Sequence, residues 1–190
     1  MKAIEDKGQD LGITKLLMME NAGSSIANCV YRKFSHLPPG LAVKVVAIAG
    51  TGNNGGDVMV AARHLAYWPI FFPTLILIGK ENEIFADEAR TNWEILSRTS
   101  RIRKVLIDGN EKFRIFDKEI SKANAIIIGI FGTGFKGAPR LLQSRVIERI
   151  NRTKNVLKIS ADIPSGMEAD SGLSNFAVKS DMTVTMYAPK

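Results

Sequence analysis

The sequence predicts an α/β protein, a three-layer sandwich around a mostly parallel central sheet. From Leu41 onward, short apolar runs rich in β-branched residues alternate with longer amphipathic segments, which is the pattern of strand–helix–strand units. The chain has 190 residues, 45% hydrophobic and 24% charged, as in globular proteins rather than disordered or fibrous ones. We expect one domain over residues 1–190, with a helical segment at 1–40 and the sandwich core at 41–190.

The individual elements follow from the local pattern. An amphipathic helix is expected at residues 15–34, ahead of the sheet. Nearly continuous β-branched runs suit strands that are buried on both faces, and they predict strands at residues 43–50, 74–79, 104–108, 125–131, 156–159 and 182–187. With Pro139 placed in a first helical turn, the amphipathic runs predict helices at residues 57–67, 84–97, 113–122 and 139–152.

Two glycine-rich segments follow the first and fourth predicted strands. Residues 50–57 read GTGNNGGD and residues 132–137 read GTGFKG, so both match the spacing G-x-G-x-x-G. In the strand order 3-2-1-4-5, strands one and four are neighbours where the winding reverses, so both loops would border one crevice. Their backbone N–H groups would face an anionic or highly polar ligand. The alternative is that the glycines only form tight turns.

The first loop does not match two common nucleotide-binding chemistries. A P-loop needs Lys followed by Ser or Thr where this chain has Gly56 and Asp57. A dinucleotide-binding loop expects an acidic residue near the end of the second strand, and residues 74–80 contain none. We therefore expect neither phosphoryl transfer nor ordinary NAD-dependent dehydrogenation.

Two aspartates are candidates for binding or acid–base chemistry. Asp57 is either the N-cap of the predicted helix or an acceptor for ligand hydroxyl and amide groups, beside Asn53 and Asn54. Asp162 follows the fifth strand in the turn DIPSG, at residues 162–166. It is either a proton-transfer group or a residue that stabilises the turn.

Charge narrows the class of partners. Lys and Arg exceed Asp and Glu by 26 − 19 = +7, which favours anionic partners. Residues 136–158 hold seven of these cations. We expect a solvated basic face there rather than a nucleic-acid surface, because no aromatic residues interleave the cations.

Other residue counts limit the possible sites and the location. The lone Cys29 excludes an internal disulfide, and His36 and His64 lack metal-ligand spacing, so surface or packing roles are expected for the histidines. Residues 1–10 carry mixed charges, unlike a secretory signal, and no apolar run reaches the ~20 residues of a membrane span. The sequence therefore predicts a cytoplasmic protein without a membrane segment.

Four motifs occur in order along most of the chain. They are MENAG (19–23), GNNGGD (52–57) with AARHL (61–65), FGTG (131–134) and DIPSG (162–166). Together they resemble the YjeF N-terminal domain family, the NAD(P)H-hydrate epimerases. The resemblance implies a Rossmann-like domain that interconverts the R and S forms of hydrated NADH and NADPH at ring carbon 6. It also implies a partner dehydratase and a homodimer formed through the N-terminal helices.

The resemblance assigns roles residue by residue. Asp162 would contact the hydrate at the reacting end and is the candidate catalytic residue. The family's potassium ion would be bound by Asn54 and Ser165. The charge of Lys136 suggests contact with the dinucleotide's phosphates. The hydrate itself would be held by Asn53, Asn54, Gly55, Gly56, Asp57, Gly132, Thr133, Gly134, Phe135, Lys136, Gly137, Ala138 and Asp162.

The chain departs from the family pattern at three places. Ile128 stands where the family has an acidic ligand, which removes charge from the cation site and predicts weakened potassium binding. Val58 replaces the glycine usual after Gly-Gly-Asp and would lie beside the ligand loop. Relatives continue beyond Lys190 with a further strand, so we expect a sheet edge that is incomplete or paired with a subunit.

Three functions are therefore compared. The leading hypothesis is an epimerase, supported by Asp162 and the segment 53–57. The alternative is a catalytically degraded member of the same fold that serves as a nucleotide-binding or protein-interaction module, which Ile128 favours. A nucleic-acid-associated version, motivated by the basic stretch at 136–158, is the third.

Overall fold

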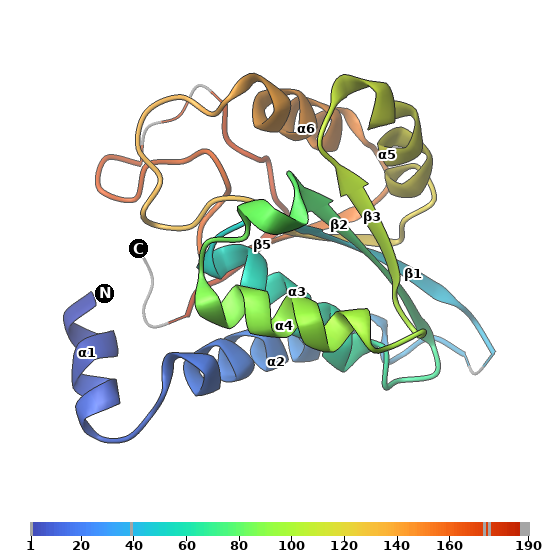
Figure 1. Cartoon of the computed structure of the whole chain (residues 1–190). Coiled ribbons are helices and arrows are strands. Elements are labelled where there is room, and N and C mark those ends of the chain that lie inside the picture. The colour runs from blue at the N-terminus through green and yellow to red at the C-terminus, as the bar shows by residue number, and fades with distance from the viewer. Residues whose placement is uncertain (1, 39, 173, 175, 187–190) are drawn as a thin grey trace.

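A single six-stranded sheet organises the computed structural model, which describes residues 2–38, 40–172, 174 and 176–186. The strand order is β3-β2-β1-β4-β5-β6, and every neighbouring pair is parallel (Figure 1). The predicted order 3-2-1-4-5 and the three-layer α/β sandwich are confirmed. The strands are β1 (Val43–Ala49), β2 (Phe71–Ile78), β3 (Arg103–Ile107), β4 (Ala125–Gly129), β5 (Leu157–Ala161) and β6 (Met182–Val184).

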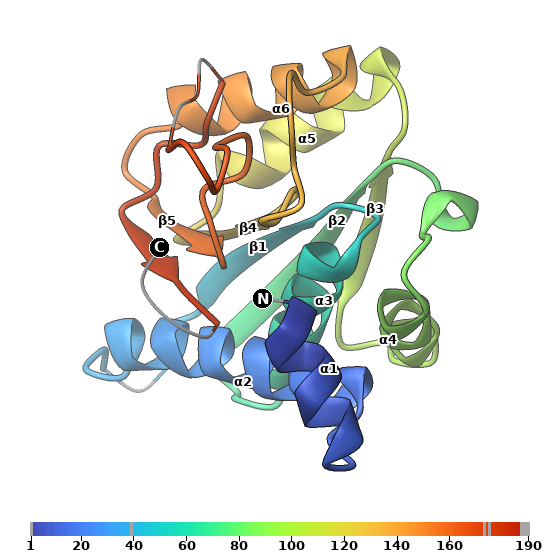
Figure 2. The same ribbon diagram turned by 90° about the vertical axis from the view of Figure 1, so that its left-hand side faces the viewer.

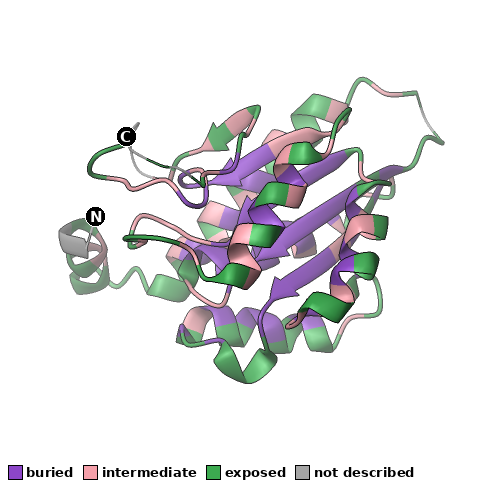
Figure 3. Cartoon of the chain, turned by 90° about the horizontal axis from the view of Figure 1, so that it is seen from above, coloured by how far each residue is buried: buried purple, intermediate pink, exposed green. Residues whose placement is uncertain are grey.

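Helices cover both faces of the sheet. On one face lie α2 (Lys15–Phe34), α3 (Asn53–Leu65) and α4 (Asp87–Ser97), and on the other lie α5 (Phe113–Ile120) and α6 (Leu141–Arg152) (Figure 1). Each face has its own apolar cluster, and successive residues of β1 alternate between the two. The central strands β1, β2 and β4 are therefore mostly buried on both sides, and Figure 3 shows this burial in the middle of the sheet; it explains their nearly continuous apolar sequences.

Some boundaries differ from the predictions. The helix α3 begins at Asn53 with Gly52 as its N-cap, so the predicted N-cap role of Asp57 is wrong and this carboxylate lies in the second turn. The helix α4 begins only at Asp87, because the preceding residues are extended. Pro139 precedes α6, whose N-cap is Arg140, and is not in its first turn.

The remaining differences lie at edges of the fold. The sequence predicted a helical segment over residues 1–40 but placed an individual helix only at 15–34, so α1 (Lys2–Asp10) was not located. The strand β2 starts three residues before its predicted position and includes Pro73, while pairing with β3 begins only at Thr74. A proline is tolerated where a strand has fewer partners. The predicted sixth strand ran to Tyr187, which lies outside the described residues. Short 3-10 turns, η1 (Glu81–Glu83) and η2 (Asn110–Lys112), precede α4 and α5.

The basic stretch on α6 is partly neutralised within the protein. The guanidinium of Arg149 lies 4.3 Å from the centroid of the Phe113 ring, and its Nε is 3.6 Å from Asp117 Oδ1. Arg152 pairs with Glu148 at 2.6 Å. Across the part of the chain that the structure describes, none of the helices has the length and apolarity needed to cross a membrane.

Three glycines allow β1, β4 and α3 to meet at the carboxyl edge of the sheet. A Cβ atom on Gly50 would lie 2.1 Å from Ile130 O, and one on Gly55 would lie 2.0 Å from Gly50 O. A Cβ on Gly129 would lie 2.4 Å from Asn54 O and 2.5 Å from Val58 Cγ2. The first turn of α3 therefore packs directly on backbone, and any side chain at these positions would push the elements apart.

We predict that Gly55→Ala lowers the free energy of unfolding by about 2 kcal/mol or more, because the added methyl overlaps the Gly50 carbonyl. Gly134→Ala is the matched control: nothing lies within 4 Å of its Cβ position, so its change should stay below about 0.5 kcal/mol. Urea denaturation followed by circular dichroism measures both. Equal stabilities for Gly55→Ala and the native protein would contradict this packing.

Candidate functional site

A cavity of about 1130 Å³ opens at the carboxyl ends of the strands. Its wall contains both glycine-rich loops, from the β1–α3 and β4–α6 connections, together with the turn after β5. The structure thus brings together segments more than a hundred residues apart in the chain, at the point where the winding reverses. The sequence-predicted residues that line it are Asn53, Asn54, Asp57, Gly132, Thr133, Gly134, Phe135, Lys136, Ala138 and Asp162.

Four predicted site residues do not line the cavity. Gly55 and Gly56 are buried in packing, since a Cβ on Gly56 would lie 2.5 Å from Met19 Sδ. Gly137 has a φ of +79° and donates its N–H to Glu168 Oε1 at 3.1 Å, which fits a turn residue. Ser165 is fully buried behind the wall. These residues shape the site without facing its interior.

Asp162 is aimed by an unusual backbone turn. Its φ is +62°, in the left-handed region that asparagine and aspartate tolerate better than most residues. The N–H of Ile163 donates to Ala161 O at 2.7 Å and closes a three-residue turn centred on Asp162. The N–H of Asp162 itself donates to Val184 O on β6 at 2.8 Å. Strand β6 therefore holds in place the turn that presents this carboxyl group.

Asp57 faces the same cavity from α3. Its spacing from Asn53 and Asn54, four and three residues, places all three side chains on one face of the helix. Burial raises the pKa of the Asp57 carboxyl well above its ordinary range, and the negative charges of Asp162 and Glu5 raise it further. The cavity therefore holds two carboxyl groups, and the charge of Asp162 favours protonation of Asp57.

Asn54 and Ser165 organise the wall between β4 and β5. The Nδ2 of Asn54 donates to Phe131 O at 2.7 Å and to Ala161 O at 3.1 Å. The hydroxyl of Ser165 accepts the N–H groups of Ile130 and Phe131, both at 3.1 Å, and its geometry also allows donation to Phe131 O at 3.1 Å. The Oδ1 atom of Asn54 is buried and has no hydrogen-bond partner among the residues that the structure describes.

Two of the positions at which the chain departs from the family pattern lie beside this wall, and both are core residues. Ile128 is fully buried in the apolar cluster shared with α5 and α6. Val58 is also fully buried, and its Cγ2 approaches the Gly129 backbone. Val58 therefore packs beneath the site, and the expectation that it lies beside the ligand loop is wrong.

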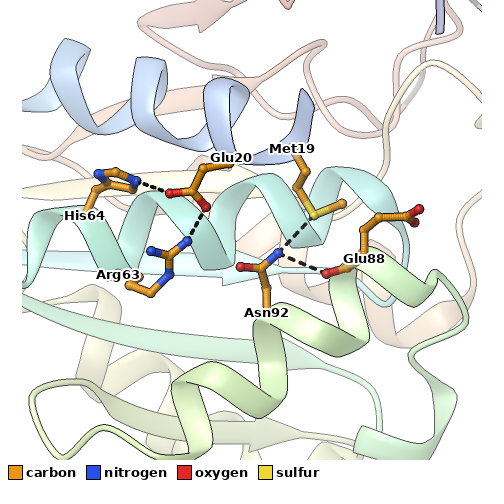
Figure 4. Close-up of polar contacts among 6 residues, drawn as sticks. All are labelled: Met19, Glu20, Arg63, His64, Glu88 and Asn92. Atoms are coloured by element: carbon orange, nitrogen blue, oxygen red, sulfur yellow. Dashed lines mark hydrogen bonds and ion pairs between the residues drawn. The ribbon is translucent and has the colours of Figure 1, made fainter. Parts of the chain in front are cut away.

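Polar contacts join helix α2 to helices α3 and α4 (Figure 4). The carboxylate of Glu20 on α2 pairs with Arg63, and its Oε1 lies 2.7 Å from His64 Nε2. Burial raises the pKa of Glu20, but the hydrogen bonds from His64 and Arg63 outweigh it, and the net direction is downward. The packing role expected for His64 is thus the one observed. From α4, Asn92 Nδ2 donates to Met19 Sδ at 3.4 Å.

These contacts give the MENAG segment a structural role. Met19 fills the space left by Gly56, and Glu20 fixes the far end of α3. A Cβ on Gly23 would lie 2.6 Å from Asp57 O, so this glycine lets α2 approach α3 closely. The sequence analysis quoted the motif without assigning these contacts, because each joins residues more than thirty positions apart.

Several cavity residues were not predicted from the sequence. Lys15, Asn21 and Ser25 contribute from α2, and Glu5 contributes from α1. The connection from β2 to α4 adds Phe85 to the wall, which also contains the carboxylates of Glu83 and Glu88. Other cavity residues outside the predicted set include Glu83, Phe85, Glu88, Arg140, Gln143, Thr185 and Met186.

Comparison with known proteins places these features in a family. The model of the family described as "YjeF-related protein N-terminus" matches residues 15–190. The NAD(P)H-hydrate epimerase of Cenarchaeum symbiosum is 39% identical over the whole chain, and that of Nitrosopumilus maritimus is 35% identical; the chain covers 83% of each. The bifunctional NAD(P)H-hydrate repair enzyme Nnr of Hyperthermus butylicus is 37% identical over 98% of the chain, which spans 33% of that protein.

A solved structure shares the fold. The crystal structure of the yeast protein ynu0 superposes with a TM-score of 0.73 and covers 96% of this chain and 77% of the yeast chain. Sequence identity between the two is 24%, so this likeness supports the architecture described above.

The raised pKa of Asp57 predicts a pH-dependent stability. Because the folded protein binds this proton more tightly than the unfolded chain, the stabilisation is complete below the ordinary aspartate pKa of about 4 and is lost as pH rises through the raised pKa. Asp57→Asn removes the effect, so the native melting temperature should fall relative to this variant as pH rises above ~4. Exposed Asp170 is the control, and Asp170→Asn should follow the native curve. Parallel curves for the native protein and Asp57→Asn would contradict the assignment.

Proposed function

Because the chain belongs to the YjeF-related N-terminal family, we propose that it interconverts the R and S forms of hydrated NADH and NADPH, a step in repair of the nicotinamide cofactor. The observation that carries this proposal is the meeting of Asp57, Asp162 and both glycine loops around one cavity. Two relatives that are 35% and 39% identical over the whole chain bear the name NAD(P)H-hydrate epimerase.

The reaction needs proton transfer and a polar cradle rather than a redox group. The ring nitrogen of the hydrate donates its electron pair, and the bond from carbon 6 to its hydroxyl breaks. A proton supplied to that oxygen lets it leave as water, and the ring becomes an iminium cation. Water then adds to carbon 6 from either face and returns a proton to the carboxyl pair. Atoms and charge balance over this cycle, and only the configuration changes.

We assign contact with the reacting hydroxyl to Asp162. The left-handed turn and the bond to β6 fix its carboxyl group, which is 7% exposed. Asp57 is the neighbouring group that holds a proton, because burial and the charge of Asp162 raise its pKa. Two carboxyl groups that face one cavity can supply the acid toward the leaving hydroxyl and the base toward the incoming water.

The cavity also suits the size and charge of a dinucleotide. Its volume of about 1130 Å³ slightly exceeds the roughly 300–1,000 Å³ common for small-molecule sites. Lys136 and Arg140 lie in the wall on the β4–α6 side, where their charges would attract the diphosphate. The backbone N–H groups at the start of α3 provide further donors.

The residues present do not fit the family's potassium ion. The acidic ligand is absent, since Ile128 stands at its position and is buried among apolar side chains. The Ser165 hydroxyl already accepts two N–H groups, and Asn54 Oδ1, although it lacks a partner, is neutral. Neutral oxygens alone hold a cation less strongly than a site with a carboxylate. These contacts favour epimerisation without a bound potassium ion.

We predict that initial rates in potassium chloride and in tetramethylammonium chloride at equal ionic strength agree within about twofold. The reverse test is Ile128→Asp, which introduces an acidic residue at the position where the family has its acidic ligand. Thermal denaturation checks that this variant folds. A native rate that collapses when potassium is withdrawn and returns when it is added would overturn this proposal.

Assembly and partners extend the proposal. Figure 2 shows α1 outside the three layers, next to the first residues of α2. The large apolar side chains exposed along this region are Ile4, Leu11, Ile13, Leu16 and Leu17. Such a patch favours a homodimer contact. The bifunctional relatives favour a dehydratase as functional partner. A cytoplasmic location stays a prediction of the sequence.

The epimerase proposal predicts that Asp162→Asn slows interconversion of the hydrates by about 100-fold or more, because an amide cannot exchange the required proton. Chromatographic separation of the R and S forms, corrected for spontaneous exchange, measures the rate. The melting temperature of the variant should stay near the native value, and Asp170→Asn should retain native activity. If the native chain accelerates no interconversion in any salt, the binding-module alternative is favoured instead.

A further inference from the structure

Phe85 is a large apolar side chain left open to solvent at the rim of the cavity. It is 73% exposed, whereas the residues on either side of it, Ile84 and Ala86, are 0% and 9% exposed. Exposure of an aromatic ring forgoes the stabilisation that burial would give. Because its neighbours are anchored in the core, the backbone here is fixed and only the phenyl ring projects outward.

Hydrogen bonds hold this segment against the first glycine loop. The N–H of Phe85 donates to Thr51 O at 3.1 Å, so the segment after η1 is tied directly to that loop. The N–H of Ile84 donates to Glu81 O at 3.2 Å, and the guanidinium of Arg90 donates to Ile84 O. The backbone that carries the ring is therefore held beside the glycine loop.

The ring lies over Gly52. A Cβ atom built on Gly52 would be 2.8 Å from Phe85 Cζ, so the ring occupies space that any other residue at position 52 would fill. Both residues line the cavity. An exposed aromatic ring on an anchored backbone beside a glycine-rich loop offers a flat surface on which a planar ring can stack.

We propose that Phe85 forms the stacking surface for the adenine ring of the dinucleotide, at the end of the cavity opposite Asp162. The inference rests on the proposed function, which supplies a ligand with two ring systems. Adenine is flat and aromatic. The hydrated nicotinamide ring contains saturated carbons and is puckered, so it stacks less well.

The sheet topology assigns the two rings to opposite ends. Phe85 follows β2, and Asp162 follows β5, and these strands lie on opposite sides of the central pair β1 and β4. A dinucleotide lying across the carboxyl edge with its hydrated ring at Asp162 therefore extends toward Phe85. The first glycine loop lies between them, on the path of the diphosphate.

The charges around Phe85 favour adenine over phosphate at this end. Glu83 and Glu88 line the cavity beside it, and their carboxylates would repel a phosphate. A carboxylate accepts hydrogen bonds, and the exocyclic amino group of adenine donates them. The cations Lys136 and Arg140 belong to the connection after β4.

Calorimetric titration of the full chain with ADP-ribose and with nicotinamide mononucleotide tests the proposal. Phe85→Ala should weaken ADP-ribose binding about tenfold, while Phe85→Trp keeps the native affinity, because a larger aromatic surface still stacks. Binding of nicotinamide mononucleotide, which lacks adenine, should not change. Phe72→Ala is the matched control, since Phe72 is also exposed on the β2 side but does not line the cavity.

An unchanged ADP-ribose affinity in Phe85→Ala would overturn the proposal, as would an equal loss for both ligands or no binding of ADP-ribose by the native chain. The outcome is separable from that of the proposed function. A native chain that binds ADP-ribose through Phe85 but does not interconvert the hydrates keeps the adenine subsite and refutes the epimerase. An active enzyme whose KM for hydrated NADH is unchanged in Phe85→Ala keeps the epimerase and refutes the subsite.

Discussion

The side-chain amide of Asn54 joins three segments on which the whole site depends. From the first turn of α3 it donates to the carbonyl of Phe131, after β4, and to that of Ala161, at the end of β5. Such bonds are possible because Gly50, Gly55 and Gly129 let the backbones approach without side chains between them. Loosening this junction would separate the two glycine loops, and the carboxyl groups would no longer face one cavity.

The electrostatics of the cavity favour proton transfer over the anion binding for which glycine loops commonly serve. A carboxyl group on α3, near where a bound pyrophosphate is stabilised in other nucleotide sites, opposes tight anion binding there. Asp57 avoids that cost by holding a proton, since burial and the charge of Asp162 raise its pKa. With Ile128 in place of an acidic residue, we infer that the pair of carboxyl groups carries the reaction without help from a bound cation.

Sequence patterns predicted the sheet well and the edges of the site less well. The β-branched runs located all six strands, and most clearly β1, β2 and β4, because residues buried on both faces leave a continuous apolar signature. The start of α3 was misplaced because Asp57 resembles an N-cap, whereas close backbone packing lets the helix begin at the glycine loop itself. Phe85 and the contact of Glu20 with Arg63 and His64 were missed, since pairs distant in the chain leave no local pattern.

The most direct test of the common cavity is a nuclear magnetic resonance titration of the uniformly ¹⁵N-labelled chain with hydrated NADH. Backbone amides of residues 50–57 and 132–137 should shift together with that of Asp162, at one shared dissociation constant. Shifts confined to one loop, or to residues away from the carboxyl edge of the sheet, would contradict the common cavity and with it the carboxyl pair as the reacting groups.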